Sequence, residues 1–336
     1  MSEPALGVSA SPHVKGGDST PTIMWSVVAS LVPVVASAIY FFGPSAALLL
    51  AASCAGALAT EMCFGQRGTR RLCDGSAAIT GLLLGLTLPP GLPLWMAFLG
   101  GAFGIGFGKL VYGGLGQNVF NPALLGRAFL QAAFPVAITT WPVRAESWWS
   151  LRGDNFALPL MSPATQDAFS GATPLGLMKF EQTATSSWDL VLGTTAGSLG
   201  ETSGLVILVC GLYLAVRRHL EWRIPASIFC TVALLAGGLH LLDAARYPGP
   251  VFTLFSGGLM LGAVYMATDM VTSPVTHRGC WIFGAGIGLL VIVIRLWGGL
   301  SEGVMYAILL MNALVPFINR ATQPRVFGAI EAEGGS

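Results

Sequence analysis

The chain has 336 residues, of which 54% are hydrophobic and only 10% are charged, and its mean hydropathy is +0.70. This composition excludes a soluble globular domain and is typical of a protein that crosses a membrane many times. The formal net charge is +1, and no basic stripe with interleaved aromatic residues is present, which excludes a nucleic-acid-binding protein.

The first 21 residues are polar and rich in Gly, Ser and Pro, which predicts a disordered cytoplasmic tail without a cleavable signal. Ten apolar runs follow, most of them near the length that a helix needs to cross about 30 Å of hydrocarbon. Five of them form a first membrane region, 22–135: 22–42, 44–63, 75–89, 92–112 and 119–135. Five more form a second region, 204–318: 204–218, 223–243, 250–268, 279–297 and 300–318. The fold class is therefore an all-α polytopic membrane protein with one long loop, 136–203, and a cytoplasmic tail, 319–336.

Two runs of the first region are short and interrupted by proline. Pro89 and Pro90 end the third run, and Pro122 follows Asn121 at the start of the fifth. Proline removes a backbone donor, and bare backbone at membrane depth is tolerated only inside protein or beside a polar cavity. These two runs are therefore predicted to lie in the interior.

Two echoes in the sequence suggest that the two regions are related. The run Gly-Gly-Leu at 113–115 recurs at 298–300, an offset of 185, and the Gly- and Leu-rich run at 81–85 is echoed at 258–262, an offset of 177. Five spans per half would place the two halves in opposite orientations, as in an inverted repeat with broken helices near the midplane. The expected breaks lie at 87–90 and 268–274.

Basic residues orient the spans. With the N-terminus inside, eleven Lys and Arg residues are predicted on the cytoplasmic side and four outside, as the positive-inside rule requires. The long loop, 136–203, is then periplasmic or external. The inner set is Lys15, Arg67, Arg70, Arg71, Lys109, Arg217, Arg218, Arg223, Arg278, Arg320 and Arg325, and the outer set is Arg144, Arg152, Lys179 and Arg246.

Few charged residues fall within the spans. Arg127 and Arg295 do, and acidic residues lie near span ends at Glu61, Asp74, Asp243, Asp269 and Glu302. Ionisable groups at membrane depth are costly and point to a function, but snorkelling or structural pairing explains the two arginines equally well. The six cysteines match no zinc or iron–sulfur ligand set, so no metal site is predicted.

The segment 113–122, Gly-Gly-Leu-Gly-Gln-Asn-Val-Phe-Asn-Pro, has two interpretations. Asn118 and Asn121 are three residues apart, so their amides can face one side of a helix start and bind a planar polar ligand. Alternatively, Asn121 is a helix N-cap with Pro122 at the first helical position. The two roles are compatible.

Residues 167–173 read Asp-Ala-Phe-Ser-Gly-Ala-Thr within the long loop. The segment is similar to the acceptor pattern of flavin transferases, Asp-x-x-Ser/Thr-Gly-Ala-Thr, in which the last Thr hydroxyl is esterified to the phosphate of FMN. Small residues on its N-terminal side would admit a transferase and a bulky nucleotide. The resemblance makes Thr173 the FMN phosphoryl threonine, within an acceptor motif of Asp167, Ser170, Gly171 and Ala172.

Most of the chain carries a second, wider resemblance. Motifs at 74–76, 80–81, 88–90, 113–122, 126–128, 134–135, 268–274, 302–303 and 311–312 resemble the RnfD family, which belongs to the Rnf ion-translocating ferredoxin:NAD oxidoreductase. The same motifs resemble, less closely, NqrB of the sodium-pumping NADH:quinone reductase. The short N-terminal tail favours the Rnf family.

This resemblance implies a subunit of a redox-driven Na+ or H+ pump, without catalytic residues of its own, in a bacterial inner membrane. It implies covalent FMN on Thr173 and noncovalent riboflavin in the helical bundle, which we expect near Asn118 and Asn121. The implied partners are the lipid bilayer, a maturing flavin transferase and the other Rnf subunits, including a second covalent-flavin subunit and membrane iron–sulfur subunits. A solute channel of the urea or ammonium type, or a structural anchor, is the alternative, and neither would use Thr173.

Overall fold

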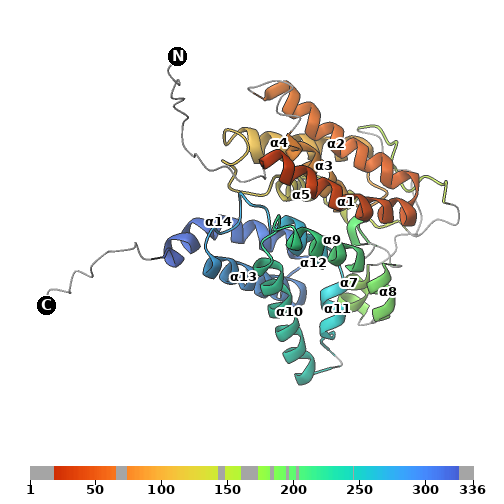
Figure 1. The fold of residues 1–336 in the computed structure, drawn as a ribbon. Coiled ribbons are helices and arrows are strands. Elements are labelled where there is room, and N and C mark those ends of the chain that lie inside the picture. The colour runs from red at the N-terminus through yellow and green to blue at the C-terminus, as the bar shows by residue number, and fades with distance from the viewer. Residues whose placement is uncertain are drawn as a thin grey trace, which may run out of the picture.

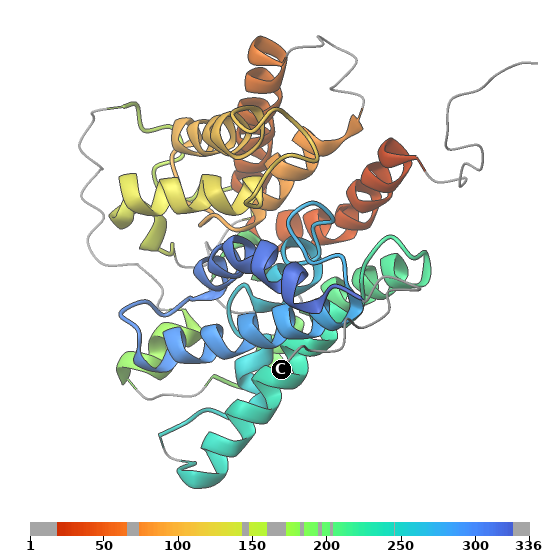
Figure 2. The ribbon, with the colours of Figure 1, turned by 90° about the vertical axis from the view of Figure 1, so that its left-hand side faces the viewer.

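The computed structural model describes residues 19–65, 74–142, 148–159, 173–181, 185–193, 197–201, 204–244 and 246–324. Within these ranges the regular structure is helical, and the predicted all-α fold is confirmed. Helices of the first half, red to yellow, gather on one side of the molecule, and those of the second half, green to blue, gather on the other (Figures 1 and 2).

The first half follows the predicted spans closely. Its long helices α1 and α2 meet at Gly43, a glycine with φ of 71° that begins the turn before Pro44. The third and fifth elements are short, as their prolines predict. The elements are α1 (Thr20–Phe42), α2 (Pro44–Phe64), α3 (Ser76–Leu86), α4 (Leu94–Ile105) with the π-helix η2 (Gly106–Leu110), α5 (Pro122–Ala133) and α6 (Pro135–Thr139).

The second half contains one break that the sequence did not predict. The run 250–268, expected as one span, divides into α11 (Pro250–Phe255), α12 (Leu259–Leu261) and the π-helix η5 (Gly262–Met266). Gly257, with φ of 66°, lies in the interruption, where a left-handed residue ends the α-helix. The other elements are α9 (Gly204–Val216), α10 (Arg223–Leu242), α13 (His277–Trp297) and α14 (Val304–Thr322). Helix α14 thus begins and ends four residues later than the predicted span 300–318.

The two halves pack their elements in the same order. Helix α2 packs on α4 as α10 packs on α13, and α4 packs on α5 as α13 packs on α14. Corresponding elements also meet across the halves, α1 with α9 and α5 with α14. This is the packing order that the internal repeat predicts.

Glycine allows the closest helix contacts of the first half. A Cβ atom on Gly56 of α2 would lie 2.0 Å from the carbonyl oxygen of Phe98 in α4, and one on Gly101 of α4 would lie 2.3 Å from that of Ser53. Small residues at such positions are the usual means by which membrane helices approach one another.

Parts of the long loop pack on the helical bundle. The backbone amide of Arg152 donates to Ser45 Oγ at 2.8 Å, and Asn155 Nδ2 donates to the carbonyl oxygens of Pro90 and Leu92 at 3.0 and 2.9 Å. The short 3-10 helix η4 (Leu199–Glu201) is buried against α3, where the Leu199 amide donates to Leu88 O. These segments satisfy the bare backbone that follows α3.

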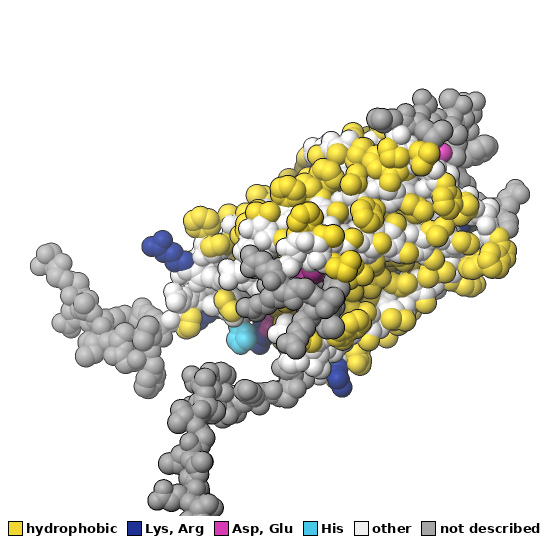
Figure 3. Space-filling model, turned by 90° about the horizontal axis from the view of Figure 1, so that it is seen from above, with side chains coloured by type: hydrophobic (Ala, Val, Ile, Leu, Met, Phe, Trp, Pro, Cys, Tyr) yellow, Lys and Arg dark blue, Asp and Glu magenta, His cyan; other side chains and the backbone are white. Residues whose placement is uncertain are grey.

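Five helices, α1, α2, α10, α13 and α14, are long and apolar enough to cross a membrane. Three shorter apolar stretches, 76–86, 94–110 and 204–216, accompany them. Figure 3 shows a face of the molecule covered largely by hydrophobic side chains, and Leu241 on α10 is 88% exposed. Exposed leucines of this kind suit a lipid environment. Lys109, one of the basic residues predicted on the cytoplasmic side, is only 2% exposed and pairs with Glu61 inside the bundle.

Candidate functional site

Thr173 lines a cavity of about 410 Å³ between the two halves, here called the Thr173 cavity. Thr173 is the N-cap of α7 (Pro174–Gly176), and its Oγ1 accepts a hydrogen bond from the Gly176 amide at 3.1 Å. The other lining residues come from α5, α6, the π-helix η3 (Leu177–Glu181) and α14 with the loop before it: Arg127, Gln131, Ile138, Thr139, Trp141, Gly176, Phe180, Glu181, Gly299, Leu300, Ser301, Glu302, Met305 and Tyr306. This volume lies within the usual range of about 300–1,000 Å³ for small-molecule sites.

Two contacts hold the segment 174–181 against the bundle. Leu175 packs against Gly257, where a Cβ atom would lie 2.5 Å from Leu175 Cδ1. Lys179 Nζ donates to the carbonyl oxygens of Gly298 and Leu300 at 2.6 and 2.9 Å, and burial lowers the pKa of its ammonium. Thr173 is therefore fixed at the cavity by anchors on its C-terminal side.

A cluster of charged side chains adjoins the cavity, and two of its members, Arg127 and Glu302, line it. Arg127 Nη2 donates to Glu302 Oε2 at 2.5 Å, and this pair joins α5 to the loop before α14. Glu201 belongs to the same cluster, and burial and the Glu302 carboxylate together raise the pKa of Glu201 well above its ordinary value. Arg295 completes the cluster, with Nη1 and Nη2 donating to Thr253 O and Ser256 O at 2.6 and 2.8 Å. Structural pairing, one of the two interpretations of these arginines, is what the geometry shows.

A second cavity, of about 90 Å³, lies where α1, α3, α9 and η5 meet the loop before α5, and we call it the Asn118 cavity. Both predicted asparagines line it. Asn121 Oδ1 caps α5 by accepting from the amides of Ala123 and Leu124, and its Nδ2 donates to Met266 O at 3.1 Å. Asn118 Nδ2 donates to Phe120 O at 3.3 Å, whereas the buried Asn118 Oδ1 has no partner. The cap is present, and one amide acceptor stays available for a ligand.

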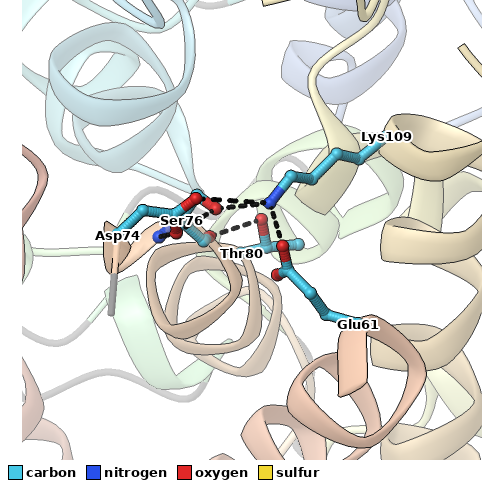
Figure 4. A network of polar contacts seen from close by, with 5 residues as sticks. All are labelled: Glu61, Asp74, Ser76, Thr80 and Lys109. Atoms are coloured by element: carbon cyan, nitrogen blue, oxygen red, sulfur yellow. Dashed lines mark hydrogen bonds and ion pairs between the residues drawn. The ribbon is translucent and has the colours of Figure 1, made fainter. Parts of the chain in front are cut away.

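A polar network borders the Asn118 cavity (Figure 4). Lys109 Nζ donates to Glu61 Oε1 and to Ser76 Oγ, both at 2.5 Å, and lies 3.9 Å from Asp74 Oδ2. Asp74 Oδ1 accepts from the Ser76 amide at the start of α3. One cation therefore neutralises carboxylates from two segments that are close only in the folded chain.

The structure brings some predicted site residues together and leaves others undescribed. Thr173 lies in one cavity and Asn118 and Asn121 line the other, whereas Asp167, Ser170, Gly171 and Ala172 are outside the described residues. Sequence reasoning did not single out Glu201, whose position in a loop gives no periodic signal. It also gave no partner for Arg127, because Glu302 is 175 residues away.

Comparison of the sequence with known proteins shows the family of this chain. The family model described as NQR2, RnfD, RnfE matches residues 7–328. The chain is 44% identical to the D component of the ion-translocating oxidoreductase complex of Stutzerimonas stutzeri, with 92% of each chain covered. It is 40% identical to the D component of the proton-translocating ferredoxin:NAD(+) oxidoreductase complex of Clostridium ljungdahlii, with 96% of each chain covered.

A third relative differs in the ion that its name gives. The D component of the Na(+)-translocating ferredoxin:NAD(+) oxidoreductase complex of Acetobacterium woodii is 39% identical, with 98% of this chain and 97% of the relative covered. Overall identity thus does not distinguish a proton pump from a sodium pump here. The resemblance seen in the motifs is confirmed over nearly the whole length, and the chain belongs to the NQR2, RnfD, RnfE family.

Proposed function

We propose that this chain is the RnfD component of an Rnf-type ferredoxin:NAD oxidoreductase that moves Na+ or H+ across the bacterial inner membrane. In this proposal it is a flavoprotein that relays electrons and works only within the complex. The observation that carries the proposal is the position of Thr173. The last residue of a segment similar to the flavin-transferase acceptor pattern lines a cavity between the two halves, in a chain of this family.

The Thr173 hydroxyl suits a phosphoester. Its oxygen accepts from the Gly176 amide, and its own O–H donates in no recorded hydrogen bond of the described residues, so the proton is free to leave. A transferase would join Oγ1 to the flavin phosphate while the group previously on that phosphate departs. Thr173 is only 8% exposed, so we expect the segment 174–181 to dock after modification or to open for it.

The Asn118 cavity supports the second flavin, riboflavin. Asn118 Oδ1 offers an acceptor, and Asn121 Nδ2, which donates one N–H to Met266 O, keeps another. A planar ring with adjacent donors and acceptors would match these amides, and apolar side chains such as Val27, Leu83 and Val264 would cover its faces. Flavins at the two sites would supply one-electron chemistry, while the protein fixes their positions and tunes their potentials.

The remaining assignments follow from the family resemblance. The partners would be the other Rnf subunits, including a second covalent-flavin subunit and membrane iron–sulfur subunits, together with the maturing flavin transferase and the lipid bilayer. The termini would face the cytoplasm and the Thr173 cavity the periplasm, as the distribution of basic residues predicts.

Intact mass and peptide mapping of the chain, expressed with its flavin transferase, test the covalent site. An FMN mass on Thr173 is expected in the wild type and absent in Thr173→Val, which keeps the side-chain shape but lacks the hydroxyl. Thr139→Val is the matched control, because Thr139 lines the same cavity and should leave the mass unchanged. An unmodified Thr173 in redox-active membranes would contradict the proposal and favour the channel or anchor alternatives.

Extraction tests the riboflavin site. We expect one riboflavin per chain to be released by denaturing the wild type, and Asn118→Leu to lose it while keeping the FMN on Thr173. A chain that holds only the covalent flavin would refute the second site without affecting the first.

A further inference from the structure

Charged side chains cluster beside the Thr173 cavity, and two of them, Arg127 and Glu302, line it. Arg127 and Arg295 are cationic and Glu302 pairs with Arg127, while burial and the Glu302 carboxylate raise the pKa of Glu201 well above its ordinary value, which favours its uncharged form. The two cations of this partly buried cluster therefore exceed its acidic charge. The other acid at the cavity, Glu181, is exposed to solvent at the end of η3, where water screens it. A buried excess charge is costly unless an anion balances it.

Arg127 is the group that can reach such an anion. It is 8% exposed, and Glu302 occupies only its Nη2, so Nε and Nη1 make no recorded hydrogen bond within the described residues. Glu302 fixes the plane of the guanidinium while the remaining N–H groups stay free. A fixed guanidinium with free N–H groups is the geometry that binds phosphate with two hydrogen bonds.

The neighbouring cations are already occupied. Both terminal nitrogens of Arg295 donate to backbone carbonyls of the interrupted helix, and Lys179 Nζ donates to two others. Among the described residues that line the Thr173 cavity, Arg127 is the one Lys or Arg side chain. The same wall therefore holds both the hydroxyl to be esterified and the cation suited to the ester's charge.

We propose that Arg127, positioned by Glu302, binds the phosphate of the flavin nucleotide in the Thr173 cavity and makes this site select a phosphorylated flavin. The inference rests on the proposed function, since it assigns a residue to the phosphate of the same nucleotide. Arg127 is a binding residue and Glu302 a positioning residue, and neither takes part in bond making at Thr173.

The test uses Thr173→Ala in the full chain, so that the cavity is free of covalent flavin and binding is reversible. FMN and riboflavin are titrated separately by flavin fluorescence into protein that retains its extractable flavin. We expect FMN to bind about 10- to 100-fold more tightly than riboflavin, the range that charge-assisted hydrogen bonds supply. Adding Arg127→Gln should bring the ratio of the two dissociation constants near one and leave riboflavin binding unchanged. Adding Arg246→Gln instead, an exposed arginine that does not line this cavity, should leave the ratio as it was.

Loss of Arg127 leaves Glu302 buried without its partner, so Arg127→Gln risks misfolding. The variant Arg127→Gln with Glu302→Gln removes both charges, should unfold at nearly the parental temperature, and should also lose the preference for FMN. A preference that survives in a folded Arg127 variant, or is absent from Thr173→Ala itself, overturns the inference. Failure of the proposed function is separate, because it would show as an unmodified Thr173 in the mass of the wild type.

Discussion

Replacing Lys109 by Met should be among the most damaging single changes in the first half. The Lys109 side chain is 2% exposed and that of Glu61 is 0% exposed, and Lys109 is the one recorded partner of the Glu61 carboxylate. Removing one member of a buried ion pair costs about 3–5 kcal/mol, because the remaining charge has neither water nor a counterion. Ser76 Oγ would lose its 2.5 Å donor in the same variant.

The geometry also predicts an order among the variants. Glu61→Gln should lower the stability by less, about 1–3 kcal/mol, because Lys109 Nζ keeps its hydrogen bond to Ser76 Oγ and lies 3.9 Å from the Asp74 carboxylate. The double variant Lys109→Met with Glu61→Gln should be more stable than Lys109→Met alone, because the uncompensated charge is gone.

Equilibrium unfolding in mixed micelles, followed by tryptophan fluorescence, measures the three variants against the wild type. Asp74→Asn is the matched control, because Asp74 is the more distant and more exposed carboxylate, and it should cost about 0–1 kcal/mol. A loss below about 1 kcal/mol for Lys109→Met, or strictly additive effects in the double variant, would refute a coupled buried pair.

Two glycine substitutions test the packing of the site and of the bundle. Gly257→Ala should cost about 1–2 kcal/mol from its positive φ alone and displace Leu175, so amide exchange across 174–181 should accelerate about 5- to 30-fold. Gly258→Ala, whose Cβ meets open space, should not alter exchange, and equal exchange in the two variants would contradict the anchor. Gly56→Ala should destabilise by about 1–3 kcal/mol through overpacking against α4, and Gly106→Ala, with its nearest neighbour at 3.7 Å, should be neutral. Equal melting temperatures for this second pair would show that α2 and α4 do not pack as described.

Long apolar helices were predictable from the sequence, because hydropathy over about 20 residues follows directly from the thickness of a bilayer. The run 250–268 was mistaken for one such helix because its composition is uniformly apolar. The backbone conformation at 256–258, with a positive φ at Gly257, interrupts the helix. The sequence alone does not predict whether a glycine in an apolar run adopts a positive or a negative φ. The 3-10 helix η4 could not be predicted from the sequence either, because it is short and is stabilised by contacts with α3.

For the candidate site, local motifs were informative and distant pairings were not. Thr173 and the two asparagines belong to short patterns whose chemistry is contained in neighbouring residues. The pairing of Arg127 with Glu302 depends on how the two halves dock, and no spacing in the chain encodes that. The partner of Lys109 was unpredicted for a related reason, because Glu61 is 48 residues away in the sequence.

In each half, a buried basic side chain lies beside an interrupted helix. Its hydrogen-bond partners differ between the two halves. Thr253 follows Ser76 by the repeat offset of 177, and Arg295 follows Lys109 by 186, one more than the offset of 185 found nearby. In the first half, Lys109 neutralises the Asp74 carboxylate that caps the start of α3.

In the second half, Arg295 donates to Thr253 O and Ser256 O, carbonyls at the end of α11 that an unbroken helix would have satisfied. Backbone groups left unpaired by a helix interruption inside a bilayer need hydrogen-bond partners. The polar side chains that pair with them can also line a cavity. The Asn118 cavity adjoins the first of these clusters through Lys109, and the Thr173 cavity adjoins the second through Glu302. Each cavity therefore adjoins a cluster of charged side chains that compensates an interrupted helix.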